Sequence, residues 1–318
     1  MRSRSSRLFA AVATATALVA ALSPAVLHAQ GDLDLGTSSY QFLKLPLAPR
    51  IVAMGGAGAA LAEGAGEAEI NPAAAARAGG ALVVGQEYPA AEFGTNASHI
   101  SWNLPWGART VAVHARYLGF DDIPGWDADN NATTPYQAHT IKLQAGLAGS
   151  RLGFDWGAGA AWARNNIADA TYSALLMNAG LRRDLAASGP LKDVAAGAAV
   201  MNLPLWAGES QSASEPVEPP VILQAGLAYT RALRADTRLA VALDVRRVGD
   251  DDAVFPVGAE VTYLEVLSLR AGYPLADPDN GIGLGIGLRW SRFGFHYAYK
   301  GHSTLSGGHG WVLEIRDL

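Results

Sequence analysis

Side chains alternate between apolar and polar along nearly the whole chain from Ala81 onward, and this pattern limits the fold more than any other feature. In residues 238–246, leucine and valine alternate with arginine, alanine and aspartate. In residues 281–288, isoleucine and leucine alternate with glycine. Successive side chains of a β-strand point to opposite faces, so each segment would have one apolar face and one face of charged residues or bare glycine. The sequence therefore predicts an all-β fold.

Fourteen segments of this kind can be counted, at 81–88, 96–105, 109–120, 137–149, 151–166, 169–184, 193–204, 221–233, 237–249, 253–263, 266–274, 281–290, 293–301 and 308–317. Many are about 9–14 residues long, which suits a tilted membrane strand better than a soluble sheet. Bacterial single-chain barrels have an even number of strands. We therefore expect a 14-stranded antiparallel transmembrane β-barrel, with a soluble β-sandwich as the alternative. The longest loops, 121–136 and 205–220, both follow odd-numbered strands and share one end, which we expect to be extracellular.

The composition agrees with a membrane barrel. The chain of 318 residues is 50% apolar but only 17% charged, whereas soluble proteins contain about 25% charged residues. No apolar run of about 18 residues follows the N-terminal region, so we expect no transmembrane helix. Aromatic residues near strand ends, such as Trp106, Trp156 and Trp290, resemble the girdles that mark the two membrane interfaces.

The N-terminus has the three parts of a secretory signal peptide. Arginines among the first seven residues precede an apolar stretch at 8–22, and a plausible cleavage site ends at Ala29. We therefore assign residues 1–29 to a signal peptide that exports the chain, residues 30–80 to a plug and residues 81–318 to an outer-membrane barrel.

The stretch between the leader and the strands, residues 51–74, is rich in glycine and alanine. It has too many small residues for a lipid-facing strand and is too apolar for an ordinary linker. A dinucleotide-binding loop is excluded because Leu61 stands where the third glycine is needed and no strand–helix alternation follows. We expect the stretch to lie inside the barrel, where glycine allows close packing. The residues predicted to form this plug or gate are Met54, Gly55, Gly56, Gly58, Asn71 and Pro72.

Polar residues opposite the apolar face of each strand are predicted to point into the lumen. Charges inside a barrel most often pair with one another, and lining a transport route is the second interpretation. The glycines that alternate with apolar residues in 281–287 would form a stripe against which a plug could lie. The predicted lumen-facing residues are Arg116, Asp155, Arg164, Asp244, Arg246, Glu260, Arg270, Gly283, Gly285 and His296.

No sequence pattern indicates catalysis, a cofactor or a metal. The chain has no cysteine, its seven histidines lie apart, and no serine has a nearby histidine–aspartate arrangement. Residues 127–131 resemble the start of a calcium loop, but Ala132 and Ala138 replace the glycine and glutamate that such a loop requires. A net charge of −5, with basic residues spread along the chain, gives no indication of nucleic-acid binding. We therefore expect a non-enzymatic protein.

The stretch from Tyr40 to Ala62 resembles the opening of the PorV/PorQ family of outer-membrane proteins. The shared features are a Phe-Leu pair, a nearby proline, an arginine before Ala-Met-Gly-Gly, and the later Asn71-Pro72-Ala73. Later pieces agree in their order: Asn178-Ala-Gly-Leu181, Ala199-Val-Met-Asn202-Leu203, Val257-Gly-Ala-Glu260, Leu269-Arg-Ala-Gly-Tyr273, Gly283-Leu-Gly285 and His296-Tyr-Ala-Tyr299. His296 departs from the family, in which aspartate is common before Tyr-Ala-Tyr.

The resemblance implies a barrel like that of FadL-type fatty-acid transporters, with 14 strands and an N-terminal plug. It also implies an association with type IX secretion, in which members receive secreted cargo at the outer membrane. Our first hypothesis is a barrel embedded in outer-membrane lipid that serves secretion or surface attachment, binding cargo or secretion proteins through loops 121–136 and 205–220. The alternative is a FadL-like channel for uptake of a hydrophobic small molecule, with residues 51–72 as gate. A structural barrel with a closed lumen is the third hypothesis.

Overall fold

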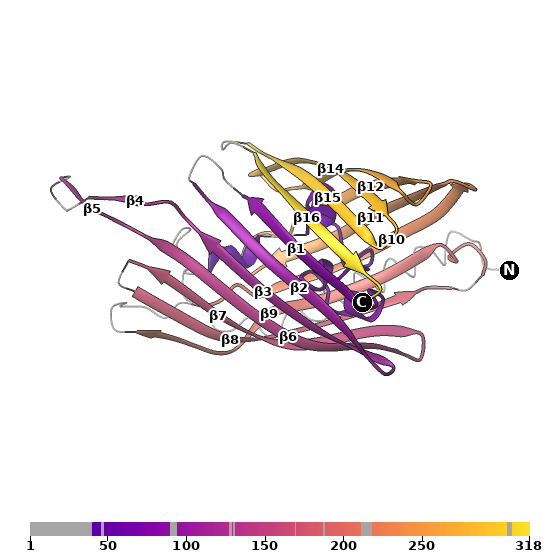
Figure 1. Cartoon of the computed structure of the whole chain (residues 1–318), viewed down its shortest axis with the longest axis horizontal. Coiled ribbons are helices and arrows are strands. Elements are labelled where there is room, and N and C mark those ends of the chain that lie inside the picture. Colours follow the sequence, from indigo (N-terminus) through magenta and orange to yellow (C-terminus); the bar gives the residue numbers. More distant parts are fainter. Residues whose placement is uncertain are drawn as a thin grey trace. The chain divides into compact units, whose positions relative to one another are not determined.

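The computed structural model describes residues 40–45, 48–89, 94–126, 129, 131–168, 170–186, 188–210, 218–303 and 307–318, which are coloured in Figure 1. The predicted signal peptide, residues 30–39 of the predicted plug and most of the calcium-like stretch 127–131 lie outside these residues. The barrel strands are β1 (Ala81–Tyr88), β2 (Asn96–Trp106), β3 (Arg109–Gly119), β6 (Ala138–Arg151), β7 (Phe154–Ile167), β8 (Ala170–Asp184), β9 (Val194–Ser210), β10 (Ile222–Arg234), β11 (Thr237–Val248), β12 (Phe255–Tyr263), β13 (Leu267–Leu275), β14 (Asn280–Trp290), β15 (Phe293–His302) and β16 (Gly308–Arg316).

These 14 strands of the described chain close into one antiparallel barrel. Their order is β1-β16-β15-β14-β13-β12-β11-β10-β9-β8-β7-β6-β3-β2. The ring closes between the first and last strands, where Ala81 lies opposite Arg316 and Tyr88 opposite His309. The all-β, 14-stranded antiparallel barrel predicted from the alternation is therefore confirmed.

The strand that departs most from its prediction is β9, which was expected to end near residue 204 and to open into the loop 205–220. A bulge at Asn202, whose φ is +59°, shifts the register of β9 against β8. The Asn202 N–H donates to Asn178 Oδ1 at 2.7 Å, which holds the bulge in place. Because a bulge adds one residue to a strand, it reverses the alternation beyond it. The alternation of apolar and polar residues is therefore lost near Asn202, although β9 continues to Ser210. The predicted start of the loop at residue 205 was wrong.

The other predicted long loop, 121–136, contains a two-stranded sheet of its own. It consists of β4 (Ile123–Trp126) and β5 (Ala132–Tyr136), which pair with each other and with no barrel strand in the described chain. In Figure 1 this hairpin projects beyond the ends of the neighbouring barrel strands. Most of its residues are exposed, and Trp126 is 61% exposed.

The two ends of the barrel differ in how the strands are connected. At the end that we call the turn end, short turns at 107–108, 152–153, 235–236, 264–266 and 291–292 join most strands, and a longer connection joins β8 to β9. The opposite end, which we call the loop end, holds the connections that follow β1, β3 and the later odd-numbered strands of the sequence-based count. Both long connections lie at the loop end, which outer-membrane barrels direct to the cell exterior.

The outer surface of the barrel is apolar. On β11, Ala242 and Asp244 are buried inside, whereas Val241 and Leu243 on the outer face are 36% and 52% exposed. Large aromatic residues stand outside at the turn end, where Trp106 and Trp290 are 65% and 80% exposed. No described helix is long and apolar enough to cross a membrane. An apolar belt with aromatic rims is the surface that lipid covers.

Arg164 lies on this outer surface, so its predicted lumen-facing position was wrong. It is exposed, and it shares the outer face of β7 with Trp162, opposite the buried Ala163 and Asn165. The position is close to the loop end of the strand, where a long cationic side chain reaches the interface between lipid and water. Arginine at the end of a membrane strand is tolerated on either face, so residue type alone does not reveal its direction.

We expect the substitution Leu243→Arg to destabilise the barrel by about 2–4 kcal/mol, because arginine at mid-membrane depth is costly on the lipid face. The matched substitution Leu264→Arg, in an exposed turn of the turn end, should cost about 0–1 kcal/mol. Reversible urea unfolding in lipid vesicles, followed by tryptophan fluorescence, measures both values. Equal costs at the two positions would contradict the membrane placement of the outer face.

Candidate functional site

The chain before the first strand packs against the inner wall of the barrel. It forms η1 (Gln41–Lys44), α2 (Pro49–Ala53), η2 (Gly66–Glu69) and η3 (Pro72–Ala76), seen as indigo coils between the strands in Figure 1. We call residues 48–77 the plug and residues 40–45 the lead segment. Ile51, Ala53 and Met54 are completely buried although the chain around them is short and irregular, because the barrel wall surrounds them.

The plug lies directly against inward-facing glycines of six strands, and five of these glycines face its backbone. A Cβ atom added to Gly258 would stand 2.6 Å from the Met54 carbonyl oxygen, and one on Gly272 would collide with the peptide between Met54 and Gly55. Such distances leave room for hydrogen only, so the contact requires glycine. Five glycines meet plug backbone in this way, and Gly180 of β8 meets the side chains of Asn71 and Pro72 instead. The five are Gly157, Gly197, Gly258, Gly272 and Gly283.

The glycine stripe on β14 divides into two parts. Gly283 faces the carbonyl groups of Val52 and Ala53, and a Cβ added to Gly285 would lie 2.5 Å from the Ala53 Cβ. Gly281 faces the neighbouring strand, and Gly287 faces the side chains of Arg270 and His296. Half of the stripe therefore seats α2, and the other half does not touch the plug.

After α2 the plug turns sharply at Gly55 and Gly56, with φ values of +69° and +96°. A Cβ on Gly55 would lie 2.5 Å from the Tyr273 backbone nitrogen, whereas one on Gly56 would meet only Pro256, at 3.6 Å. Both positions favour glycine through their backbone conformation, and Gly55 does so also through lack of space. Met54 then packs with Ala57, Ala60 and Leu61 against wall alanines from β9, β10 and β11.

Arg50 joins the plug to the β12–β13 wall through a network of charges. Its Nε and Nη2 atoms donate to the two carboxylate oxygens of Glu260, each at 2.9 Å. Its Nη1 atom lies 3.3 Å from Glu67 Oε2, and the same Glu260 accepts from Arg270 Nε at 2.6 Å. A bidentate arginine–carboxylate pair fixes the direction of the two side chains as well as the distance between them. It therefore holds α2 in one orientation against the wall.

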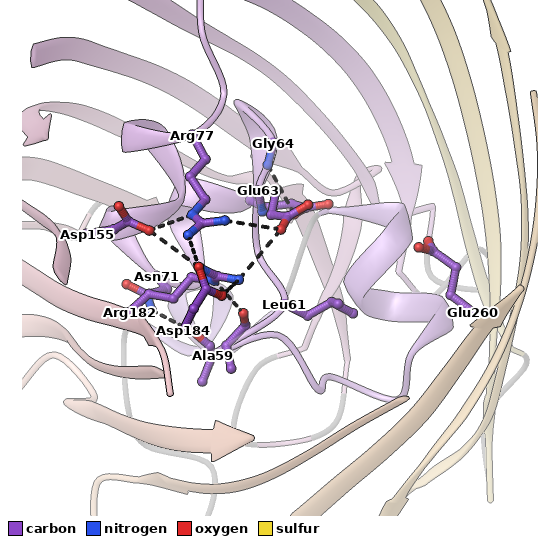
Figure 2. Close-up of polar contacts among 12 residues, drawn as sticks. Ala59, Leu61, Glu63, Gly64, Asn71, Arg77, Asp155, Arg182, Asp184 and Glu260 are labelled. Atoms are coloured by element: carbon purple, nitrogen blue, oxygen red, sulfur yellow. Dashed lines mark hydrogen bonds and ion pairs between the residues drawn. The ribbon is translucent and has the colours of Figure 1, made fainter. Parts of the chain in front are cut away.

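Arg77 makes a second ionic cluster where the plug meets the turn end (Figure 2). It pairs with Asp155 of β7 and Asp184 of β8. Arg182 pairs with the same two carboxylates, at 3.4 and 3.0 Å, and donates to the Ala60 carbonyl at 2.8 Å. Figure 2 shows Arg77 and Arg182 facing the carboxylates from opposite sides, with Glu63 beside them and Glu260 on the far side of the plug. The cluster ties the end of the plug to β7 and β8.

Two further polar contacts hold the middle of the plug. Asp244 Oδ2 accepts from the backbone N–H groups of Gly58 and Ala59, both at 2.8 Å. The Asn71 side chain accepts from the Ala73 N–H at 3.0 Å and donates to the Ala59 carbonyl at 2.6 Å. Asn71 thus caps η3, whose first residue is Pro72. An N-cap side chain followed by proline starts a helical turn.

The lead segment lies near the loop end and has an apolar face. Tyr40, Phe42 and Leu43 pack against the wall residues Ala97, Leu118, Ala161, Ala163, Ala174 and Leu176. Two predicted lumen residues bind its backbone: Arg116 Nη1 donates to the Leu45 carbonyl at 3.2 Å, and Arg246 Nη2 donates to the Lys44 carbonyl at 2.8 Å.

A cavity of about 460 Å³ lies on the turn-end side of the plug. Its walls come from the plug, from strands β11 to β16 and from β1 and β2, and most of the lining residues are charged or polar, with Arg289, Arg316 and Glu314 among them. His296 borders it, with Nδ1 at 3.2 Å from Arg270 Nη1 and Nε2 at 3.9 Å from Glu314. The cavity therefore offers a polar chamber, not the apolar tunnel that a simple hydrophobic conduit would require.

Glu69 carries a further charge at the end of η2. Its Oε1 lies 3.8 Å from Lys142 Nζ of β6. Burial alone would raise the pKa of Glu69, but Lys142, Arg116 and two nearby histidines lower it to about 2. Glu69 is therefore ionised at neutral pH.

The sequence did not single out several residues that hold the plug. Arg50, Glu67, Arg77 and Arg182 belong to the ionic networks, and five plug-facing glycines lie outside the stripe at 281–287. Strand alternation could have found Gly258 and Gly272, because they share a face with Glu260 and Arg270. The partners of Arg50 and Arg77 carry no local signal, since they lie far away in the sequence.

No protein-family model and no curated protein matches the chain. Solved structures do match it. The CymD monoaromatic hydrocarbon channel is 17% identical, with a TM-score of 0.54, over 85% of this chain and 96% of that chain. The toluene transporter TodX of Pseudomonas putida is 12% identical, with a TM-score of 0.54, over 85% of this chain and 97% of that chain. The chain has the fold of these hydrocarbon channels. The resemblance to the PorV/PorQ family receives no support from these comparisons.

We expect Gly272→Ala to release the plug while leaving the barrel intact. Overpacking a tight contact costs about 1–3 kcal/mol, so trypsin cleavage after Arg50 and Arg77 should accelerate about tenfold or more. Limited proteolysis in detergent, with heat-dependent gel mobility to report on the barrel, measures both effects. Gly301→Ala is the control, because its added Cβ would meet Ile282 backbone at an ordinary 3.5 Å. A barrel that unfolds together with the plug would contradict the expectation.

Proposed function

We propose that the protein is an outer-membrane channel for hydrophobic small molecules, with the plug as its gate. The observation that carries the proposal is the fold shared with the CymD and TodX channels, together with a plug that occupies the inner wall. The apolar outer face supports a place in lipid. This was the alternative hypothesis from the sequence, and the comparisons favour it over a role in protein secretion.

The lead segment marks where a hydrophobic solute would enter. It covers an apolar wall near the loop end with Tyr40, Phe42 and Leu43. Binding sites for hydrophobic molecules are concave and lined mostly by apolar side chains. The wall around Leu118 and Leu176 has this character once the lead segment moves aside. Moving the segment aside would break few polar contacts: Arg116 and Arg246 each bind one of its carbonyl groups, and Arg116 also lies 5.7 Å from the centre of the Phe42 ring.

The polar cavity on the far side of the plug favours solutes that carry a polar group. Arg289 borders this cavity, and its buried Nε has no hydrogen-bond partner among the described residues. An unmodified hydrocarbon could not accept a hydrogen bond from this N–H group, whereas a hydroxyl or carboxyl group of the solute could. We therefore extend the proposal to hydrophobic solutes with one polar end.

A disulfide between the plug and the wall tests the gate. The chain has no cysteine, and a Cβ at position 56 would lie 3.7 Å from the Pro256 Cβ, close to the spacing found in disulfides. We expect the oxidised double variant Gly56→Cys/Pro256→Cys to lose toluene uptake into proteoliposomes, and reduction to restore it. Each single variant is a control for the strained backbone at Gly56. Uptake at the wild-type rate in the oxidised protein would refute the plug as gate.

Protein secretion remains the second candidate, and the hairpin β4–β5 is the observation that favours it. This hairpin reaches beyond the barrel and exposes Trp126, a residue type enriched at protein interfaces. The sequence resemblance to PorV/PorQ proteins points in the same direction, with cargo or secretion proteins as partners.

Replacing residues 123–136 with a short glycine linker separates the two candidates. If the channel proposal holds, toluene uptake stays at the wild-type level, because the hairpin forms a sheet of its own that projects beyond the ends of the neighbouring barrel strands (Figure 1). The profile of proteins released from or attached to the cell surface, measured by mass spectrometry, should also stay unchanged. Loss of surface proteins with intact uptake would favour secretion.

A further inference from the structure

A column of polar side chains lines the lumen on the side of β1, β2, β3 and β6. Its members occupy every second position of these strands, on the inner face of the sheet. They also lie opposite one another on adjacent strands, since Ser101 pairs with His114 and His99 with Arg116. All of them are buried. The column consists of Glu87, His99, Ser101, Asn103, His114, Arg116, Lys142 and Gln144, and Glu69 of the plug faces it.

Many polar atoms in this column lack a partner. The column holds seven of the twelve buried side-chain atoms that have no hydrogen-bond partner in the described part of the chain. Burying so many polar atoms without any hydrogen bond would carry a desolvation penalty comparable to the whole free energy of unfolding of a domain. The seven atoms are Glu87 Oε1, His99 Nδ1, His114 Nε2, Arg116 Nε and Nη2, and both amide atoms of Asn103.

These atoms include both donors and acceptors, so a single ion or apolar solute could not satisfy them. Arg116 offers donors, Glu87 offers an acceptor, and Asn103 offers both. Water satisfies mixed sets of this kind, and buried polar groups in proteins are routinely paired with it. The column is therefore suited to a chain of water along the wall.

The column connects with the polar cavity at the turn end. His99 lines that cavity and also belongs to the column. From Asn103 to Glu87, which pairs with Ala97, the inner face of β2 and its neighbours extends for roughly 20 Å at the rise of an antiparallel strand. This length covers most of an apolar belt about 25 Å tall.

We propose that this column conducts water and small inorganic ions past the closed plug. The path follows the wall beside Glu69 and does not pass the glycines against which α2 packs. It therefore differs from the route proposed for hydrophobic solutes, which it meets only at Arg116 and in the turn-end cavity. The charges along it are mixed, with Arg116 and Lys142 against Glu69 and Glu87. We therefore expect small ions of either sign to pass, with weak selectivity.

Single-channel recording in planar lipid bilayers with potassium chloride tests the proposal. We expect a small steady conductance from the wild-type protein. The oxidised Gly56→Cys/Pro256→Cys protein, whose plug is fixed, should conduct equally well, although its toluene uptake is expected to stop. Lys142→Gln should shift the reversal potential in a salt gradient toward cation preference, because it removes one positive charge from the column.

A matched pair of variants locates the path. His99→Phe replaces a column residue with an apolar ring and should reduce the conductance several-fold. Thr262→Val is the control, since Thr262 lines the same cavity from β12 but lies outside the column. Heat-dependent gel mobility verifies that each variant is folded. The absence of conductance in the wild-type protein, its loss on oxidation of the double variant, or a reversal potential unchanged by Lys142→Gln would each overturn the proposal.

Discussion

The closure of β1 against β16 is the constraint from which the rest of the structure follows. Lipid offers no hydrogen bonds to a polypeptide backbone, so a sheet that crosses a membrane must have no free edge. Pairing from Ala81 to Tyr88 along the last strand meets this requirement. Closure assigns every second side chain to the lumen, which is too wide for those side chains alone to fill. The plug supplies the missing volume, and its backbone approaches the wall where glycine replaces larger residues.

The charged contacts between plug and wall set position more than stability. A buried ion pair contributes little net free energy, because desolvation offsets most of the attraction, yet breaking one costs about 3–5 kcal/mol. The pair between Arg50 and Glu260 therefore penalises any register of α2 that separates the two. The cluster around Arg77 does the same at the other end of the plug. In the middle of the plug, Asp244 accepts hydrogen bonds from the backbone N–H groups of Gly58 and Ala59. These bonds orient the plug backbone without a second charged residue.

Local pattern predicted the wall well because strand alternation is a property of neighbours in sequence. It failed where one residue breaks the period, as at Asn202, and where a side chain is compatible with both faces, as at Arg164. The glycine-rich composition of residues 51–74 indicated close packing but not against which strands. Those partners lie far away in the sequence, 122 residues for Ala60 and Arg182 and 210 residues for Arg50 and Glu260, and no spacing within the plug encodes them. The hairpin β4–β5 was missed because its strands are short and exposed on most positions, which leaves no alternation to detect.

Arg116 stands at the boundary between an apolar and a polar half of the lumen. On the same face of β3, Leu118 belongs to the apolar cluster under the lead segment, and His114 belongs to the polar column. Arg116 itself binds the Leu45 carbonyl and lies 5.7 Å from the centre of the Phe42 ring. A solute that displaces the lead segment would remove both contacts and leave the guanidinium facing the newly opened space. Entry of a hydrophobic solute and hydration of the polar column are therefore coupled through one side chain, and a solute with a polar end could replace the lost carbonyl.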